Sequence, residues 1–358
     1  MVLSTDQRVA ILLHEGILGN GGKTGLTLLR YGRAPVVAVI DRECAGESLF
    51  ELTGIDCDAP IVDSVASALP YQPDVLVIGI ACSGGVLPDT WWQDLKQGVA
   101  AGLSVINGLH TSMASDPELQ KLLKEGQKIW DIRREPPGLG VGSAKARSLQ
   151  CRRILTVGTD MSVGKMSASL ELHQAAQRQR ISSKFLATGQ AGMMIAGKGI
   201  PLDAVRVDFA AGAVEQMVMD CGNKYDLLIV EGQGSLLHPG STATLPLIRG
   251  TQPTGLVLVH RAGQTHNHHF TDIPIPPLPE VIRLYETVAY AGGAFAPTPV
   301  VAIALNTGHL DEASAQEAIK QVQVETGLPC TDVVRFGADL LMEAVMAGYT
   351  KSALPRVY

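Results

Sequence analysis

Short runs of β-branched and aliphatic residues alternate along the chain with longer segments of helical periodicity. This alternation is typical of βαβ units, which place parallel strands in one sheet and helices on both of its faces. The pattern predicts an α/β protein with two mainly parallel sheets. The expected strands cover residues 8–13, 35–40, 75–80 and 103–106 in the first half, and residues 153–157, 183–187, 226–230, 255–259 and 300–305 in the second.

A stretch rich in proline, glycine and basic residues separates the two halves. It reads RREPPGLGVGSAKARS, residues 133–148, and such a composition favours an irregular connection between domains. We therefore predict one domain at residues 1–135, a linker at residues 136–150 and a second domain at residues 151–358.

Composition and charge argue against several classes of protein. The chain has 358 residues, of which 46% are hydrophobic and 4% aromatic, and its formal net charge is −6. An acidic chain with few aromatic residues is a poor nucleic-acid binder. The sequence contains neither a spanning run of about 20 apolar residues nor the basic start and apolar middle of a signal peptide. We expect a cytoplasmic protein with a small-molecule substrate, without nucleic-acid or membrane partners, that associates with copies of itself.

The strongest chemical signal begins where the strand at residues 153–157 ends. The segment GTDMSVGKMS places a glycine-punctuated loop and a Gly-Lys pair between this strand and a helix. In that context backbone N–H groups and the positive end of the helix dipole surround an anion, and the lysine adds a cation. We predict that nucleotide phosphates bind the residues of this loop, which are Gly158, Thr159, Asp160, Ser162, Val163, Gly164, Lys165, Met166 and Ser167.

The loop departs from the usual phosphate-loop pattern in two ways. Five residues, not four, separate Gly158 from Gly164, and Met166 follows the lysine where a Ser or Thr hydroxyl usually binds Mg²⁺. Binding phosphates without hydrolysis tolerates the loss of that hydroxyl better than phosphoryl transfer does. An ordinary strand-to-helix turn with a surface lysine is the alternative interpretation.

Polar residues also follow three other strands of the second expected sheet. The carboxyl ends of parallel strands meet at one edge of a sheet, so we expect these residues to surround one ligand. Glu231, in the motif EGQGS, is predicted to be catalytic and to bind Mg²⁺; a solvated carboxylate is the alternative. Thr188 and Gln190 are predicted to bind the substrate. Asn306 is predicted to bind the nucleotide base, with a simple Asn-Thr-Gly turn as the alternative.

In the first half, three loops follow expected strands. A glycine-rich turn opens a helix and the next strand ends at Asp41, which is the layout of a dinucleotide or ribose site; a surface loop is the alternative. His110 follows the fourth strand and is a candidate general base, with structural hydrogen bonding as the alternative. The residues predicted to bind the substrate in these loops are Gly22, Lys23, Thr24, Ser83, Gly84 and Gly85.

Two resemblances extend these interpretations. The motifs GTDMSVGK, residues 158–165, and EGQGS, residues 231–235, are similar to those of dethiobiotin synthetase and related P-loop enzymes that activate carboxylates. A closer resemblance covers nearly the whole chain and includes KTGLTLLRYG, INGLHT, ATGQAGMMIAGKGIPLDAVRVDFAAGAVE and VRFGADLL. By these segments the chain resembles a two-domain family, long uncharacterised, whose characterised members are D-glutamate N-acetyltransferases that use acetyl-CoA.

The closer resemblance implies a Rossmann-like N-terminal domain and a P-loop NTPase-like C-terminal domain. It also implies acetyl transfer from acetyl-CoA to an acidic amino acid similar to D-glutamate, with the P-loop binding the nucleotide phosphates. Two alternatives stay open. One is a ligase or kinase similar to dethiobiotin synthetase, which would use ATP and Mg²⁺, with Glu231 on the metal. The other is a nucleotide-sensing regulatory protein without turnover.

Overall fold

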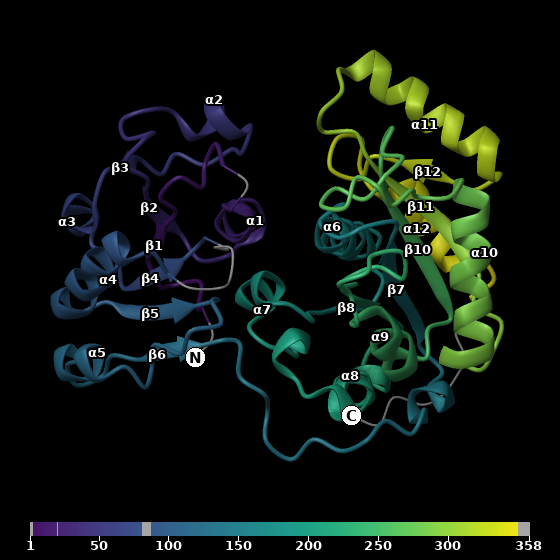
Figure 1. Cartoon of the computed structure of the whole chain (residues 1–358), viewed down its shortest axis with the longest axis horizontal. Helices are drawn as coiled ribbons and strands as arrows, with labels where there is room; N and C mark the ends of the chain where they lie inside the picture. Colours follow the sequence, from purple (N-terminus) through teal and green to yellow (C-terminus); the bar gives the residue numbers. More distant parts are fainter. Residues whose placement is uncertain (1–2, 20, 81–86, 350–358) are drawn as a thin grey trace. The chain divides into compact units, whose positions relative to one another are not determined.

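The structure is a computed structural model that describes residues 3–19, 21–80 and 87–349. The chain forms two compact units, whose elements are labelled in Figure 1. The first unit comprises Met1–Glu135 and Gln190–Ala204, and the second comprises Pro136–Gly189 and Val205–Tyr358. Residues 190–204, which the sequence pattern places in the second domain, therefore pack with the first unit.

The first unit is built on a parallel sheet with the strand order β3-β2-β1-β4-β5-β6, which is the order of Rossmann-like folds. Its central strands are continuous aliphatic runs that are buried along their whole length, as expected for a sheet covered on both faces. The strands are β1 (Val9–Leu12), β2 (Val36–Ile40), β3 (Ile61–Val62), β4 (Val75–Ile78), β5 (Ser104–Asn107) and β6 (Ile129–Asp131). The helices are α1 (Lys23–Tyr31), α2 (Leu49–Thr53), α3 (Val65–Ala68), α4 (Asp89–Ala101), α5 (Pro117–Leu122) and α7 (Gln190–Ala196), with 3₁₀ turns η1 (Leu69–Tyr71) and η4 (Leu202–Ala204).

The second unit is built on a parallel sheet with the strand order β12-β11-β10-β7-β9-β8. Its strands are β7 (Arg152–Gly158), β8 (Ser183–Leu186), β9 (Leu227–Val230), β10 (Gly255–Arg261), β11 (Val300–Asn306) and β12 (Cys330–Thr331). The helices are α6 (Lys165–Arg178), α8 (Val207–Gly222), α9 (Thr244–Thr251), α10 (Leu278–Val288), α11 (Glu312–Thr326) and α12 (Asp339–Met346). A 3₁₀ turn η3 (Lys145–Ser148) precedes β7, and a π-helical turn η5 (Ala289–Gly293) follows α10.

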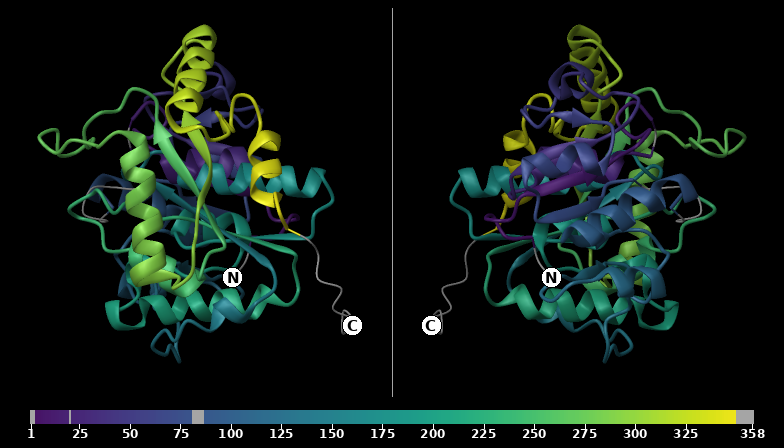
Figure 2. Two further views of the ribbon diagram at one scale, coloured as in Figure 1. Left: turned by 90° about the vertical axis from the view of Figure 1, so that its right-hand side faces the viewer. Right: turned by 90° about the vertical axis from the view of Figure 1, so that its left-hand side faces the viewer.

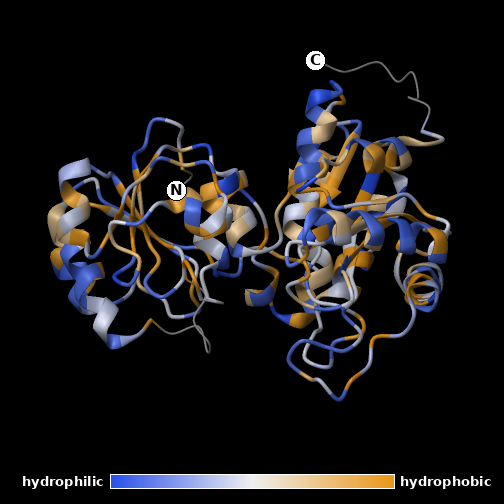
Figure 3. Cartoon of the chain, turned by 90° about the horizontal axis from the view of Figure 1, so that it is seen from above, coloured by the Kyte–Doolittle hydropathy of each residue, from blue (hydrophilic) through white to orange (hydrophobic). Residues whose placement is uncertain are grey.

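Helices cover the second sheet and bury its apolar strands. α6 and α12 pack together on the sheet through a cluster that includes Ile154, Leu172, Val257 and Leu341. α8, α9 and α10 pack against β9, β7 and β11 outside this cluster. Figure 3 shows the strands of both sheets mostly in hydrophobic colours. None of the helices in the described part of the chain is long and apolar enough to cross a membrane.

The strands expected from the hydrophobic pattern are all present, but three others are not predicted by it. These are β3, β6 and β12, which have two or three residues each and lie at sheet edges. A strand of two or three residues is too short to show a recognisable hydrophobic pattern in the sequence. The prediction of two α/β domains with parallel sheets is confirmed.

Candidate phosphate-binding site

The loop between β7 and α6 has the backbone conformation of an anion-binding site. Its φ angles are +57° at Ser162 and +115° at Gly164, and left-handed residues in such turns produce concave groups of N–H donors. α6 follows directly and has no acidic residue in its first turn, so an anion in the loop meets the positive end of the helix dipole. A Cβ at Gly164 would lie 3.7 Å from the Asn306 amide nitrogen. The positive φ angle, and not a lack of space for a side chain, is therefore the reason that this position requires glycine.

The side chain of Lys165 folds back onto the backbone of this loop. The residue is only 6% exposed, and its Nζ donates a hydrogen bond of 2.7 Å to the carbonyl oxygen of Asp160. The ammonium group is thus held next to the backbone of the loop. A phosphate bound there would offer this ammonium a charged acceptor, which forms a stronger hydrogen bond than a carbonyl does.

Two hydroxyl groups hold the start of the loop. Ser235 Oγ and Tyr285 Oη each donate a hydrogen bond of 2.7 Å to the carbonyl oxygen of Gly158. The Tyr285 hydroxyl also accepts a hydrogen bond from the Leu236 N–H at 3.1 Å. Tyr285 is completely buried, and burial raises the pKa of its phenol. The hydroxyl therefore stays protonated at neutral pH and can donate to the loop.

Asp160, a predicted ligand-binding residue, uses its side chain to anchor the loop. Its buried carboxylate accepts hydrogen bonds from the Met161 N–H at 2.7 Å, the Gln264 amide at 2.7 Å and the His268 N–H at 2.8 Å. The last two donors belong to the connection between β10 and α10, which runs out from the sheet and returns in Figure 2. Asp160 therefore fixes the loop to this connection.

The neighbouring Thr159 is fixed to the end of β10. Its hydroxyl shares a hydrogen bond of 2.9 Å with His260 Nδ1, and its N–H donates to the carbonyl of Val259 at 3.1 Å. Burial lowers the pKa of His260 to about 4. His260 is consequently neutral at physiological pH and serves the loop as a hydrogen-bonding group, not as a cation.

Glu231 lies at the end of β9, the strand next to β7. Its Oε2 accepts hydrogen bonds from the N–H groups of Thr188 at 2.9 Å and Gly189 at 3.2 Å. The Gly232 N–H donates to Thr156 Oγ1 at 2.9 Å. A Cβ on Gly232 would lie 1.7 Å from the Thr156 carbonyl oxygen, so only glycine permits this approach. The ends of β7, β8 and β9 are thereby joined.

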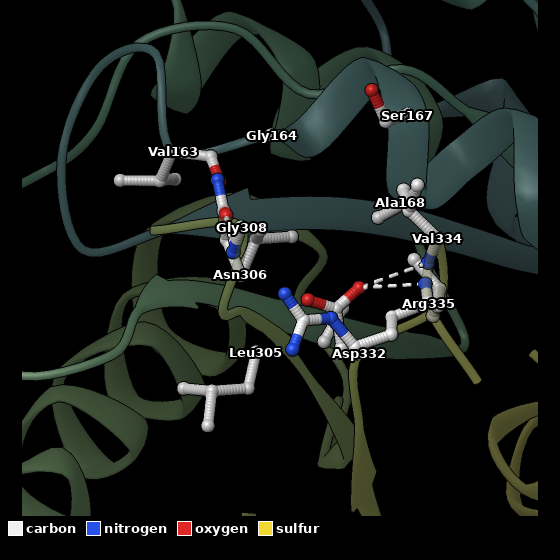
Figure 4. A pocket seen from close by; sticks show the side chains of 13 residues that line it. Val163, Gly164, Ser167, Ala168, Leu305, Asn306, Gly308, Asp332, Val334 and Arg335 are labelled. Atoms are coloured by element: carbon white, nitrogen blue, oxygen red, sulfur yellow. Dashed lines mark hydrogen bonds between the residues drawn. The ribbon is translucent and has the colours of Figure 1, made fainter. Parts of the chain in front are cut away.

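A cavity of about 340 Å³ adjoins the loop on the side of β10 and β11. Asn306 stands at its wall: its Nδ2 donates to the Val163 carbonyl at 3.1 Å, and its Oδ1 accepts from the Gly308 N–H at 3.1 Å. Figure 4 shows the residues that line the cavity. They are Val163, Gly164, Ser167, Ala168, Val259, Ala304, Leu305, Asn306, Gly308, Asp332, Val333, Val334 and Arg335.

The first unit gathers a second group of predicted residues. Lys23 and Thr24 begin α1, which packs beside α7. The first residue of α7, Gln190, lies against Gly108 in the loop after β5. Gln190 therefore belongs with the first unit, whereas the residues of the P-loop, Thr188, Glu231 and Asn306 belong with the second. The predicted residues Ser83, Gly84 and Gly85 lie outside the described residues.

His110 follows β5 and is held by an arginine. Arg133 donates one hydrogen bond to the Gly108 carbonyl at 2.7 Å, and its Nη1 contacts both His110 Nε2 and the carboxylate of Asp203. Because a guanidinium can only donate, His110 Nε2 is the acceptor in this contact. His110 can act as a base through Nε2 only if Arg133 moves away from it.

Asp41, at the end of β2, does not face a ribose. Its carboxylate is 1% exposed and accepts hydrogen bonds from the N–H groups of Glu15, Ile17 and Glu43, at 3.1 to 3.3 Å. It therefore orders the loop that follows β1. This arrangement differs from the dinucleotide layout that the sequence pattern indicates.

The side chains around the loop bear on the predicted Mg²⁺ site. Met166 follows Lys165 in the first turn of α6, with Ser167 next to it, and the carboxylate of Asp160 accepts hydrogen bonds from protein N–H donors. Across residues 3–19, 21–80 and 87–349, no three His, Cys, Asp or Glu side chains are placed to hold a metal ion together.

Several contacts of the site carry no signal in the sequence, even where a residue such as Ser235 belongs to a recognisable motif. The residues of the loop that Ser235, His260 and Tyr285 contact lie 77 to 127 positions away in the sequence. Arg335 follows a strand of only two residues. An apolar helix face predicts the burial of Tyr285, but not the carbonyl to which its hydroxyl donates.

Comparisons with known proteins agree with this architecture. A family model described as "Domain of unknown function (DUF1611_C) P-loop domain" matches residues 140–342, and one described as "Domain of unknown function (DUF1611_N) Rossmann-like domain" matches residues 42–135. A crystal structure of a DUF1611 family protein from Anabaena variabilis is 68% identical, with a TM-score of 0.93 over 95% of this chain and 99% of that one.

Two curated relatives carry the same descriptive name, D-glutamate N-acetyltransferase. The relative from Tritonibacter scottomollicae is 37% identical over 76% of this chain and 81% of its own length. The relative from Pseudoalteromonas sp. is 34% identical over 78% of this chain and 83% of its own length. The similarity therefore includes most of each protein.

Proposed function

The chain belongs to the DUF1611 family, which joins a Rossmann-like domain to a P-loop domain, and on that premise we propose that it is an amino-acid N-acetyltransferase. The acceptor is an acidic amino acid similar to D-glutamate, and the donor is acetyl-CoA. The observation that carries the proposal is the name shared by two relatives that match about three quarters of the chain.

The geometry of the loop supports a role in binding the donor. CoA contains a pyrophosphate, and the loop at Gly158–Lys165 offers left-handed turns, a helix N-terminus and a buried ammonium. Acetyl transfer breaks a thioester and leaves the pyrophosphate intact. The hydroxyl that Met166 replaces is needed for metal placement in phosphoryl transfer, so an acetyltransferase loses little by its absence.

The reaction forms a C–N bond between the acceptor amine and the acetyl carbon and breaks the C–S bond of the thioester. The amine must first lose a proton, and the departing CoA sulfur gains one. Glu231 and His110 are the proposed bases. Glu231 is the more rigid of the two, because the N–H groups of Thr188 and Gly189 fix its carboxylate. His110 acts only when its contact with Arg133 opens.

Thiol release provides the direct test. The full chain is incubated with acetyl-CoA and with D-glutamate, L-glutamate, D-aspartate or no acceptor, and free CoA thiol is measured. We expect release that depends on the acceptor and is fastest with an acidic D-amino acid. Release that is equal with and without acceptors, or absent with all of them, would overturn the proposal.

Matched variants then identify the base. Glu231→Gln keeps the shape of the side chain but cannot take a proton, so it is expected to lower kcat at least about 100-fold if Glu231 is the base. His110→Gln tests the other candidate in the same way. Incubation with ATP, Mg²⁺ and the same amino acids, followed by ADP release, tests the ligase alternative. Binding of acetyl-CoA or ATP without turnover of either one would favour the regulatory alternative.

A further inference from the structure

Arg335 brings a cation to the cavity beside the P-loop. Its side chain reaches across the cavity in Figure 4, with the guanidinium beside Asp332 and near Asn306. The guanidinium donates to the carbonyl oxygens of Leu310 at 2.8 Å and Thr307 at 3.5 Å. Within the described residues it forms no ion pair with a carboxylate. These two neutral acceptors hold the guanidinium at the cavity, and the exposed Asp311 interacts with it electrostatically.

The neighbouring carboxylate of Asp332 is occupied by protein donors. It accepts hydrogen bonds from the N–H and hydroxyl of Thr307 at 2.8 and 2.6 Å, and from the N–H groups of Val334 and Arg335 at 3.0 and 3.1 Å. The side chain is also nearly buried, with 5% exposure. Asp332 therefore shapes the turn that carries Arg335, and its charge is stabilised by four donors.

The other walls of the cavity are aliphatic. Val163, Val259 and Leu305 are among them, and Gly164 and Ser167 form the side shared with the P-loop. A volume of about 340 Å³ is near the lower end of the range of roughly 300–1,000 Å³ found for small-molecule sites. It suits a flat heterocycle with part of its sugar. Because Gly164 and Ser167 line the cavity, a ligand with phosphates in the loop can extend its adjoining nucleoside into this space.

We propose that the cavity receives the adenosine end of CoA and that Arg335 binds the ribose 3′-phosphate, a group that ATP lacks. This inference rests on the proposed function, because it takes CoA as the donor. Arg335 is then the residue that distinguishes CoA from adenine nucleotides without a 3′-phosphate. A guanidinium can bind two phosphate oxygens at once, and its anchoring by Leu310 and Thr307 reduces the rotamer freedom lost on binding.

The test compares CoA with dephospho-CoA, two ligands that differ only in the 3′-phosphate. Calorimetric titrations are run on the wild type, on Arg335→Gln and on Arg283→Gln, a control that removes the same charge from an exposed position on α10. We expect the wild type and the control to bind CoA at least about tenfold more tightly than dephospho-CoA, since hydrogen bonds to charged groups are among the stronger ones. Arg335→Gln is expected to bind both ligands with the wild-type affinity for dephospho-CoA.

Each other outcome has a definite meaning. Equal binding of CoA and dephospho-CoA by the wild type, or a preference for CoA that persists in Arg335→Gln, would overturn the role of Arg335. The proposed function would still stand in that case if acetyl transfer is observed. Binding of neither ligand by the wild type would overturn both this inference and the proposed donor. Circular dichroism of each variant establishes that it is folded.

Discussion

Removing the hydroxyl of Tyr285 should loosen the P-loop by a predictable amount. In Tyr285→Phe, the Gly158 carbonyl loses one of its two hydroxyl donors but keeps Ser235 Oγ, whereas the Leu236 N–H loses its acceptor. Tyr285 is completely buried, so water does not replace the hydroxyl. One unsatisfied buried group costs about 1–3 kcal/mol, and we expect the second unit to be destabilised by that amount.

The choice of assay follows from the positions of the tryptophans. Trp91, Trp92 and Trp130 are the three tryptophans of the chain, and all lie in the first unit. Their fluorescence therefore reports on the unfolding of the first unit, whereas Tyr285 belongs to the second. Amide hydrogen exchange, read by mass spectrometry on peptides that cover β7 and α6, measures the opening of the second unit directly. Tyr290→Phe is the matched control, because Tyr290 is 59% exposed.

A double-mutant cycle makes the prediction sharper. Ser235→Ala alone also leaves one hydroxyl on the Gly158 carbonyl, but Ser235→Ala with Tyr285→Phe removes both. The double variant should therefore lose about 0.5–3 kcal/mol more stability than the sum of the losses in the two single variants, as found for residues that share a partner. Hydrogen exchange in Tyr285→Phe equal to that in Tyr290→Phe, or strict additivity of Tyr285→Phe and Ser235→Ala, would contradict this prediction.

Two further predictions concern the P-loop, and a third concerns His110 in the first unit. Gly164→Ala should introduce about 1–3 kcal/mol of backbone strain at φ +115° and weaken CoA binding, measured by calorimetry, about tenfold or more. The control Gly292→Ala places a Cβ where no atom lies within 4 Å and should leave the affinity for CoA unchanged. Equal affinities of the two variants for CoA would contradict this prediction. His260 has a pKa lowered from 6.5 to about 4 by burial, so the unfolded chain binds more protons between these pH values and the wild type should lose about 3 kcal/mol of stability from pH 6.5 to pH 4. In urea unfolding, His260→Gln should lose clearly less over that range, and an unchanged slope would argue against a buried neutral His260. Arg133→Gln should raise kcat at neutral pH if His110 is the base, because Nε2 is released; an unaltered pH–rate profile would exclude His110.

Much of the fold follows from local patterns in the sequence. The apolar runs predict the long strands because each is buried on both faces and is almost uniformly aliphatic. The P-loop is visible as well, because a glycine with left-handed φ and a lysine must lie next to each other where strand becomes helix. Such features depend on residues that are close in sequence.

The remaining features depend on contacts between distant residues. Asp41 ends a strand as a ribose-binding acid would, yet its carboxylate faces the backbone of residues 15–17. Gln190 stands two residues after Thr188, yet it begins a helix that packs with the first unit. Arg335 reaches the cavity from a turn shaped by the hydrogen bonds of Asp332. Neither periodicity nor spacing encodes these partners.

The central claim is that the loop around Lys165 binds the phosphates of the acetyl donor. Titration of acetyl-CoA in a calorimeter, without Mg²⁺, tests it most directly on the wild type, Lys165→Ala and the control Lys320→Ala, which removes an exposed lysine from α11. We predict that the wild type and Lys320→Ala bind acetyl-CoA with the same affinity and that Lys165→Ala binds it at least about tenfold more weakly, since a charge-assisted hydrogen bond is lost. The same affinity in all three proteins would contradict it.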